Sequence, residues 1–297
     1  MARANVGSIE IEYDSFGDRQ AEPLLLIMGL GGQMTVWEED FCQQLADRGH
    51  FVIRYDNRDV GLSTWFDEAG LPDLLKAFTD GMAGQPIDCP YTLEDMADDA
   101  VGLLDALGID TAHICGTSMG GMIAQIVAIR HPERVRSLTS MMSTTGDRSL
   151  PPPSPEAQAV LATPAPTERE AFIVEAVRRD GVVGSPGHPR DPEHLKQRAA
   201  RLYDRAFHPA GGARQLLAIA AQEDRTPKLR TLDVPTLVIH GKEDPLVPLS
   251  SGLATHEAIP NADLLLIDGM GHDFPRQVWG PVIDGISELT EKVRSAA

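Results

Sequence analysis

The pattern of apolar and polar residues predicts strands that alternate with helices along most of the chain. Residues 8–13 alternate apolar and polar side chains, as a strand with one exposed face does, whereas residues 24–28 are apolar throughout. A continuous apolar run is typical of a strand that is buried on both faces of a parallel sheet. Further strands are predicted over residues 51–55, 112–115, 135–142, 234–240 and 263–267. Together they indicate an α/β fold with a mainly parallel central sheet flanked by helices.

Helices are predicted between these strands from apolar residues at helical spacing and from start and stop signals. One helix with apolar residues every four positions is expected to end at Gly49. Another is expected to start after Thr92, which is followed by an acidic residue three positions on, and to end at Gly108. Residues 65–90 show weak periodicity and many turn formers, so we predict an irregular excursion there.

Residues 146–226 interrupt this rhythm of strands and helices. They open with a proline-rich stretch that cannot form regular helix or central strand, and helix-like pieces follow, separated by segments rich in Gly and Pro. We therefore predict a helical insertion over residues 146–226 and an α/β core made of residues 1–145 and 227–297. Several apolar residues of the insertion are candidates for pocket walls, although residues at helical spacing are more often core. They are Leu150, Val160, Phe172, Ile173, Leu195, Leu202, Tyr203 and Leu216.

Composition and charge narrow the classes of partner and location. The chain has 297 residues, of which 44 are acidic and 26 basic, and the resulting charge of −18 argues against binding to nucleic acid or to anionic lipid. The first residues lack the apolar stretch of a secretory signal, and the longest apolar run near the start is too short to span a bilayer. We therefore expect a cytoplasmic location without membrane insertion. Oligomeric state is not predicted.

The three cysteines give no sign of a disulfide framework or a metal site. Cys42, Cys89 and Cys115 are odd in number and show no Cys-x-x-Cys spacing, and no set of histidines has the spacing of metal ligands. Cys115 is expected to be a small buried apolar residue within its strand. No metal is therefore expected.

The strongest chemical signal is the sequence Gly-Thr-Ser-Met-Gly at residues 116–120. It lies between a predicted strand and a predicted helix, which is the context of a Gly-x-Ser-x-Gly nucleophile elbow. In such a turn the serine has a strained backbone and an exposed hydroxyl group. Gly116 and Gly120 have no Cβ that would collide with neighbouring backbone as the turn closes. Ser118 is therefore the candidate nucleophile.

A serine nucleophile needs a base and a carboxylate that orients it. His272 is the best placed base, because it ends a Gly-Met-Gly-His loop directly after the last predicted strand. Asp244 follows the preceding strand and gives the chain order Ser, Asp, His that is expected for this kind of elbow. The rival carboxylates are Glu243, Asp268 and Asp147.

The tetrahedral intermediate of acyl transfer carries an oxyanion that requires fixed donors. The candidates are the backbone N–H of Met119, next to the nucleophile, and that of Leu30, in the glycine-rich loop after the first buried strand. That loop, with Asp56 at the end of the next strand, also resembles a dinucleotide fingerprint faintly, but Met34 occupies the position of the third glycine. No Gly-Lys-Ser/Thr follows a glycine-rich loop, so a P-loop is excluded, and no cofactor is expected.

Taken together, these motifs resemble the α/β-hydrolase fold family, and within it bacterial esterases and lipases of the aclacinomycin methylesterase type. The matching motifs are residues 28–32, 55–63, 116–121, 240–244 and 269–272. One departure is Met28, where a histidine commonly precedes the glycine. The resemblance implies a helical cap over the pocket at about residues 146–226. It also implies roles for Ser118 as nucleophile, Asp244 as acid, His272 as base, and Leu30 and Met119 as the oxyanion hole.

The first functional hypothesis is hydrolysis of a carboxylic ester through a serine acyl-enzyme, on a small to medium, largely neutral substrate. Thioester or lactone hydrolysis, cofactor-free perhydrolysis and retro-Claisen cleavage can use the same residues. Haloalkane dehalogenation is disfavoured, because it needs a carboxylate at position 118. A hypothesis of another class is a non-catalytic receptor for a small ligand on the same fold.

Overall fold

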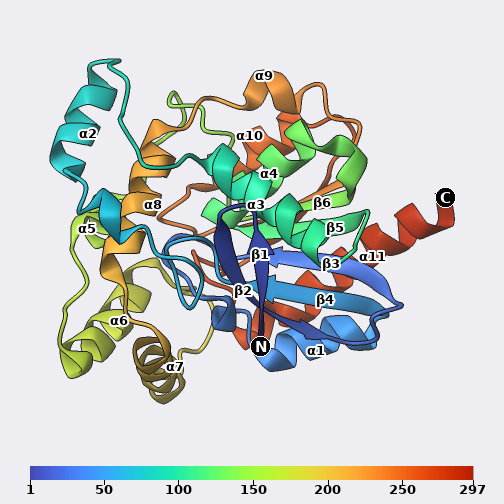
Figure 1. Ribbon diagram of the computed structural model, residues 1–297, viewed down its shortest axis with the longest axis horizontal. Coiled ribbons are helices and arrows are strands. Elements are labelled where there is room, and N and C mark those ends of the chain that lie inside the picture. Colours follow the sequence, from blue (N-terminus) through green and yellow to red (C-terminus); the bar gives the residue numbers. More distant parts are fainter. Residues whose placement is uncertain (297) are drawn as a thin grey trace.

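The computed structural model describes residues 1–296 and is built around one eight-stranded sheet (Figure 1). The strand order is β1-β2-β4-β3-β5-β6-β7-β8, in which β1 and β2 run antiparallel to their neighbours and the other neighbouring strands pair in parallel. The strands are β1 (Ala2–Val6), β2 (Ile9–Phe16), β3 (Glu22–Ile27), β4 (His50–Tyr55), β5 (Ala112–Thr117), β6 (Val135–Met141), β7 (Thr236–Gly241) and β8 (Asp263–Ile267). The predicted mainly parallel sheet is confirmed.

The central strands are buried on both faces, as their continuous apolar runs predict. On β3, Leu25 packs into a core shared with Ile114 of β5, whereas its neighbour Leu24 packs into a second core shared with Cys115. The first core is covered by α3 (Leu93–Ala106), α4 (Met119–Arg130) and α10 (Leu249–Ala258). The second is covered by α1 (Glu39–Asp47) and α11 (Trp279–Ala296). Helices on both faces leave only the ends of the strands accessible for a site.

A group of four helices lies between β6 and β7 in the sequence. These helices gather with α2 at one end of the molecule, towards which the arrowheads of β3 and β4 point (Figure 1). They are α5 (Pro155–Ala162), α6 (Arg169–Val183), α7 (Pro192–Arg205) and α8 (Pro209–Ala221), and the short α9 (Thr226–Leu229) follows them. The division into a core and an insertion at residues 146–226 stays a prediction.

The helix signals read from the sequence correspond to real caps. Thr92 and Asp95 form a capping box, with the Asp95 amide donating to the Thr92 hydroxyl at 3.2 Å and the Thr92 amide donating to the Asp95 carboxylate at 2.7 Å. Gly49 and Gly108 have φ values of 92° and 69°, so each occupies the left-handed conformation that ends a helix.

Some expectations need correction. Residues 65–90 are not irregular throughout, because they contain η2 (Asp67–Ala69) and α2 (Leu74–Met82), and the carboxylate of Asp73 caps α2 by accepting from the Lys76 amide at 2.9 Å. Of the segments rich in Gly and Pro in the insertion, the one that begins at Pro209 belongs to α8, because Pro209 occupies the first turn, where an N–H has no helical acceptor. The helix before Gly49 is interrupted at Trp37, between η1 (Met34–Val36) and α1.

The remaining short helices are η3 (Pro132–Arg134) and η4 (Arg276–Val278).

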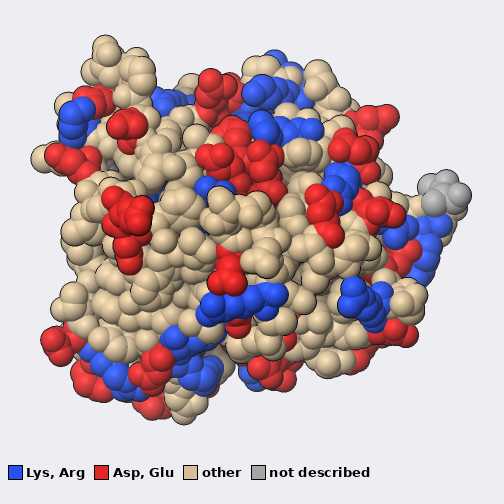
Figure 2. All heavy atoms as spheres, viewed as in Figure 1, with Lys and Arg blue, Asp and Glu red and all other residues tan. Residues whose placement is uncertain are grey.

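Acidic and basic side chains are scattered over the face of the molecule shown in Figure 2. Within residues 1–296, no group of three or more His, Cys, Asp or Glu side chains is arranged to hold a metal ion. None of the helices in the same residues combines the length and apolar character needed to cross a bilayer.

Candidate active site

Ser118 sits at a sharp turn between β5 and α4, with φ of 55° and ψ of −121°. This positive φ is unusual for a residue other than glycine and indicates backbone strain at the turn. A Cβ at Gly116 would lie 2.0 Å from the Gly120 carbonyl oxygen, and a Cβ at Gly120 would lie 2.2 Å from that of Ile27. Both positions therefore require glycine, as the sequence predicts. The Ser118 amide donates to the Met141 carbonyl at 2.9 Å, which ties the turn to β6.

The structure brings Ser118, His272 and Asp244 into one hydrogen-bonded row. The Ser118 hydroxyl lies 2.9 Å from Nε2 of His272, and Nδ1 of His272 lies 2.7 Å from Oδ2 of Asp244. The other oxygen of Asp244 accepts from the amides of Leu246 and Val247, both at 2.8 Å. With Nδ1–H donating to the carboxylate, Nε2 is left to accept from the serine hydroxyl.

The three rival carboxylates are engaged elsewhere. Glu243 accepts from the Gly269 amide at 2.6 Å, which braces the loop that carries the histidine. Asp268 forms an ion pair with Lys242 at 2.6 Å. Asp147 accepts from an amide in its own loop at 2.8 Å. None of the three is hydrogen-bonded to His272 within the described residues.

Other titratable groups on the strand that precedes the turn are structural. His113 is buried between the Ser137 hydroxyl at 2.8 Å and the Glu22 carboxylate at 3.0 Å, and burial lowers its pKa to about 4. Cys115 is completely buried, and this burial raises the pKa of its thiol to about 12. A neutral thiol at this position behaves as an apolar core residue, as expected.

One candidate oxyanion donor follows Ser118 in the chain, and the other lies in the loop after β3. Met119 is the first residue of α4, so its N–H has no acceptor within the helix. Leu30 lies in the loop after β3, and a Cβ at the preceding Gly29 would lie 3.1 Å from the Ser118 Cβ. The loop therefore passes directly against the serine. The use of both amides as an oxyanion hole stays a prediction.

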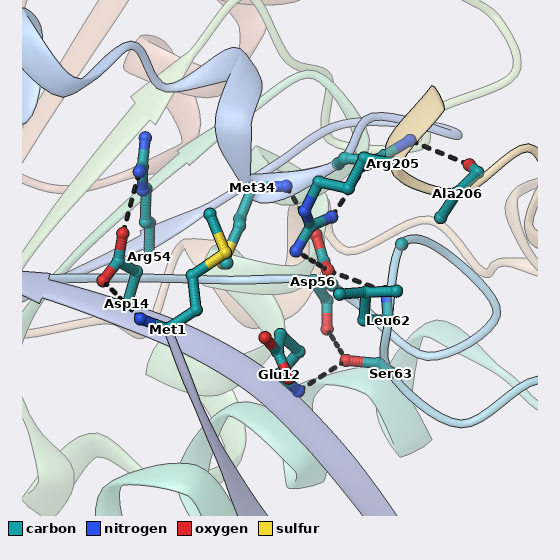
Figure 3. A network of polar contacts seen from close by, with 12 residues as sticks. Met1, Glu12, Asp14, Met34, Arg54, Asp56, Leu62, Ser63, Arg205 and Ala206 are labelled. Carbon is teal, nitrogen blue, oxygen red and sulfur yellow. Dashed lines mark hydrogen bonds and ion pairs between the residues drawn. The ribbon is translucent and has the colours of Figure 1, made fainter. Parts of the chain in front are cut away.

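Residues of the turn after β4 are hydrogen-bonded to this loop and to η1. Asn57 donates to the Met28 carbonyl at 2.9 Å. The carboxylate of Asp56 is fully buried and accepts from the Met34 amide at 2.7 Å, from the Leu62 amide at 2.9 Å and from Arg205 at 2.7 Å (Figure 3). These internal partners explain Asp56 as a support of the loop rather than as a contact for a ribose.

Side chains of α7 and α8 hold the same loop from the other side. The fully buried Gln215 of α8 accepts from the Gly31 amide at 2.8 Å and donates to the Arg58 carbonyl at 2.8 Å. Arg205, the last residue of α7, donates to the side chain of Gln33 at 2.7 Å. Neither contact can be predicted from local sequence patterns, because the partners are more than 150 residues apart.

Comparison with known proteins identifies the family. Residues 22–275 match the model of the α/β-hydrolase fold family. The chain belongs to this family. It is 28% identical over 297 residues to the rhodomycin D methylesterase of Streptomyces sp. (strain C5), with 93% of each chain covered. It is 34% identical over 255 residues to the 2-hydroxymuconate semialdehyde hydrolase of Pseudomonas sp. (strain CF600), covering 84% of this chain and 80% of the relative.

A solved structure agrees with this assignment of fold. The enol-lactonase from Burkholderia xenovorans LB400 superimposes with a TM-score of 0.70 at 20% identity, over 98% of this chain and all of the other. The relatives found by sequence are hydrolases, and this α/β hydrolase is an enzyme of the carboxylic ester hydrolase kind.

In this α/β hydrolase, a cavity of 1460 Å³ opens onto Ser118 and His272. Its floor is formed by the loops after β3, β5 and β8, and its walls are formed largely by α5 to α8. Seven of the eight apolar residues singled out in the insertion line this cavity, and the exception is Ile173, which is buried in the core of its helices. The pocket interpretation is therefore correct for most of them.

Proposed function

We propose that this α/β hydrolase cleaves a carboxylic ester through an acyl-enzyme formed on Ser118, with His272 as general base and Asp244 as the acid that orients it. The observation that carries the proposal is the row of hydrogen bonds of 2.9 and 2.7 Å from Ser118 through His272 to Asp244. A serine hydroxyl alone is a weak nucleophile, and a base aligned in this way removes its proton during attack.

The reaction proceeds in two halves. The Ser118 oxygen attacks the ester carbonyl carbon while its proton moves to Nε2 of His272, and Asp244 stabilises the resulting imidazolium. The amides of Leu30 and Met119 stabilise the oxyanion. The intermediate then expels the alcohol, which takes the proton from His272. Water next attacks the acyl-enzyme with His272 as base, so that the carboxylic acid leaves and the serine hydroxyl is restored.

The helices α5 to α8 act as a cap that supplies the walls of the pocket. The cavity volume of 1460 Å³ and its many apolar residues leave room for an ester of medium size. The name of the rhodomycin D methylesterase relative supports an ester as the substrate class. A cytoplasmic location and the absence of a nucleic-acid partner remain predictions from the sequence.

Lactone hydrolysis is the second candidate function. It is favoured by a 3-oxoadipate enol-lactonase of Acinetobacter baylyi, to which the chain is 26% identical over 260 residues. A lactone is an internal ester, so the same attack by Ser118 opens its ring. Thioester hydrolysis and perhydrolysis use the same groups, but no contact in the pocket favours them.

The test is hydrolysis of 4-nitrophenyl butyrate by the wild type and by Ser118→Ala. Loss of the nucleophile should lower turnover by about 10⁶-fold, because the three residues act as a unit. Ser149→Ala removes an exposed hydroxyl and should leave turnover unchanged. Circular dichroism confirms that both variants are folded. If Ser118→Ala hydrolysed the ester as fast as the wild type, the proposed nucleophile would be wrong.

A further inference from the structure

Most of the charged side chains that line the cavity have a hydrogen-bond or ion-pair partner within the protein. Glu38 accepts from His194 at 2.8 Å and from Arg276 at 2.7 Å. Asp180 pairs with Arg190 at 2.7 Å. Each of these groups therefore has its charge balanced within the protein, and a substrate would gain little by approaching it.

Four other charged groups of the cavity wall also have hydrogen-bond partners within the protein. Glu175 pairs with Arg179 at 2.9 Å. Asp191 caps the start of α7 by accepting from the His194 amide at 3.0 Å. Arg148 donates to two backbone carbonyl oxygens at 3.0 and 3.3 Å. These side chains serve the structure of the wall itself.

Arg198 is the exception. It lines the cavity and is half-buried, yet it makes no hydrogen bond or ion pair within residues 1–296. It lies on the inner face of α7, because Leu195 and Leu202, three residues before and four after it, line the same cavity. The neighbouring Arg201 is exposed and does not line the cavity. A guanidinium without a partner in a largely apolar cavity is poised to bind an anion.

His188 contributes a second polar atom without a partner to the cavity wall. Its Nε2 is buried and has no hydrogen-bond partner among the described residues. Its segment is tied to the loop of the catalytic histidine, since the His272 amide donates to the Val183 carbonyl at 2.7 Å and the Gly187 amide donates to the Gly269 carbonyl at 3.0 Å. Buried polar atoms normally have a hydrogen-bond partner, so the unpaired Nε2 indicates that an atom of a ligand bonds to it.

Asp273 is the acidic group of the cavity wall that would compete with a substrate carboxylate for Arg198. It lines the cavity next to His272, but it accepts a hydrogen bond from Ser185 and forms no ion pair with Arg198 within the described residues. Burial raises the pKa of Asp273, and the charge of Asp180 adds to this effect while Arg198 opposes it. Asp273 therefore interacts with the charge of Arg198 but occupies none of its hydrogen-bond donors within the described residues.

We propose that Arg198 binds a carboxylate that the substrate carries away from its scissile ester bond, with the unpartnered Nε2 of His188 as a second polar contact for the ligand in the same cavity. This inference rests on the proposed ester hydrolysis and narrows its substrate class to esters that also bear a free carboxylate, such as half-esters of dicarboxylic acids. A bidentate guanidinium–carboxylate contact gives both orientation and affinity. It also revises the expectation of a largely neutral substrate, because the local charge of the pocket matters more than the net charge of −18.

The experiment compares two series of chromogenic esters. One series consists of 4-nitrophenyl half-esters of succinate, glutarate, adipate and suberate, and the other of the same diacids with the free carboxylate capped as a methyl ester. The series spans several chain lengths, so that one member can place its carboxylate at Arg198 while its ester carbonyl reaches Ser118. The readout is release of 4-nitrophenolate, expressed as kcat/KM.

For the best half-ester, Arg198→Met should lower kcat/KM by about 10- to 100-fold, as expected for loss of a hydrogen bond to a charged group. The capped counterpart should change by less than about threefold, because it carries no charge for the guanidinium to bind. Arg198→Lys should retain part of the selectivity, since it keeps the charge but not the fork geometry. Arg201→Met removes the same charge from the exposed face of α7 and should leave both series unchanged.

The proposal would be overturned if Arg198→Met lowered kcat/KM equally in both series, or if Arg201→Met had as large an effect as Arg198→Met. It would also be overturned if no half-ester were cleaved in preference to its capped form. If no ester of either series were cleaved, the proposed ester hydrolysis would be wrong. Binding of free adipate and suberate would then test carboxylate binding by Arg198 separately. Calorimetry should then show binding to the wild type that is lost in Arg198→Met. Equal binding or none by both proteins would contradict the assignment.

Discussion

The two helical parts of this hydrolase differ sharply in how firmly they are packed. In α4, which follows Ser118, ten of the twelve residues are buried. In α6 and α7, which wall the cavity, only one residue of fifteen and one of fourteen are buried. Segments with few buried side chains open at a lower free-energy cost than core helices. The proposed nucleophile therefore precedes a rigid helix, whereas the helices proposed to contact the substrate belong to the more adaptable part of the molecule.

The two parts meet at the glycine-rich loop after β3. From the core, Asn57 holds the Met28 carbonyl, and from α8, Gln215 holds the Gly31 amide. Leu30 lies between these two points. Its N–H is therefore positioned jointly by the core and by the wall of the pocket, whereas that of Met119 depends on the core alone. The difference can be tested by variants on each side.

The largest effect is expected on the core side, from Asp244→Asn. An amide in place of the carboxylate favours the wrong tautomer of His272 and cannot stabilise the imidazolium, so kcat should fall by about 10⁴-fold. The measurement is steady-state hydrolysis of 4-nitrophenyl butyrate. Asp268→Asn is the matched control, expected to keep full activity, because it removes an exposed carboxylate whose ion-pair partner among the described residues is Lys242. A loss below about tenfold in Asp244→Asn would contradict the role of Asp244.

A smaller effect is expected on the pocket side, from Gln215→Leu. The change leaves the Gly31 amide without its acceptor, so the loop that carries Leu30 should become less well placed. We expect kcat to fall by about ten- to a hundredfold, less than for complete loss of an oxyanion donor, with little change in KM. Gln197→Leu, at an exposed position of α7, should change neither constant.

A rise in KM at unchanged kcat in Gln215→Leu would mean that Gln215 shapes the pocket only. The loop would then not connect the pocket wall to the proposed oxyanion hole, and the position of the Leu30 N–H would depend on the core alone. Thermal unfolding of each variant separates this outcome from a general loss of stability, because the Gln215 side chain is fully buried.

Local patterns predicted the elements that place the chemistry. The predicted bounds of strands such as β3 and β8 agree with the structure to within two residues. Their continuous apolar runs are typical of strands that are buried on both faces of a parallel sheet. The elbow was equally visible, since backbone contact demands glycine at positions 116 and 120. The edge strand β1 was missed, because its alternating Ala and polar residues bury little apolar surface.

Side-chain partnerships across the molecule could not be predicted in the same way. Arg205 reaches Gln33 from 172 residues away, and no local pattern records such a contact. The free guanidinium of Arg198 is visible only by comparison with its paired neighbours, which depends on every element that lines the cavity.

The helix α2 was missed because its apolar periodicity is short and its start depends on one capping contact of Asp73.

The central claim is that Ser118 is an activated nucleophile, and covalent labelling by a fluorophosphonate tests it most directly. Intact-protein mass spectrometry should show one adduct per chain, and peptide mapping should place it on Ser118. Ser118→Ala should remain unlabelled, while Asp244→Asn should label far more slowly than the wild type. An adduct on another residue, or equal labelling of the wild type and Ser118→Ala, would contradict the account.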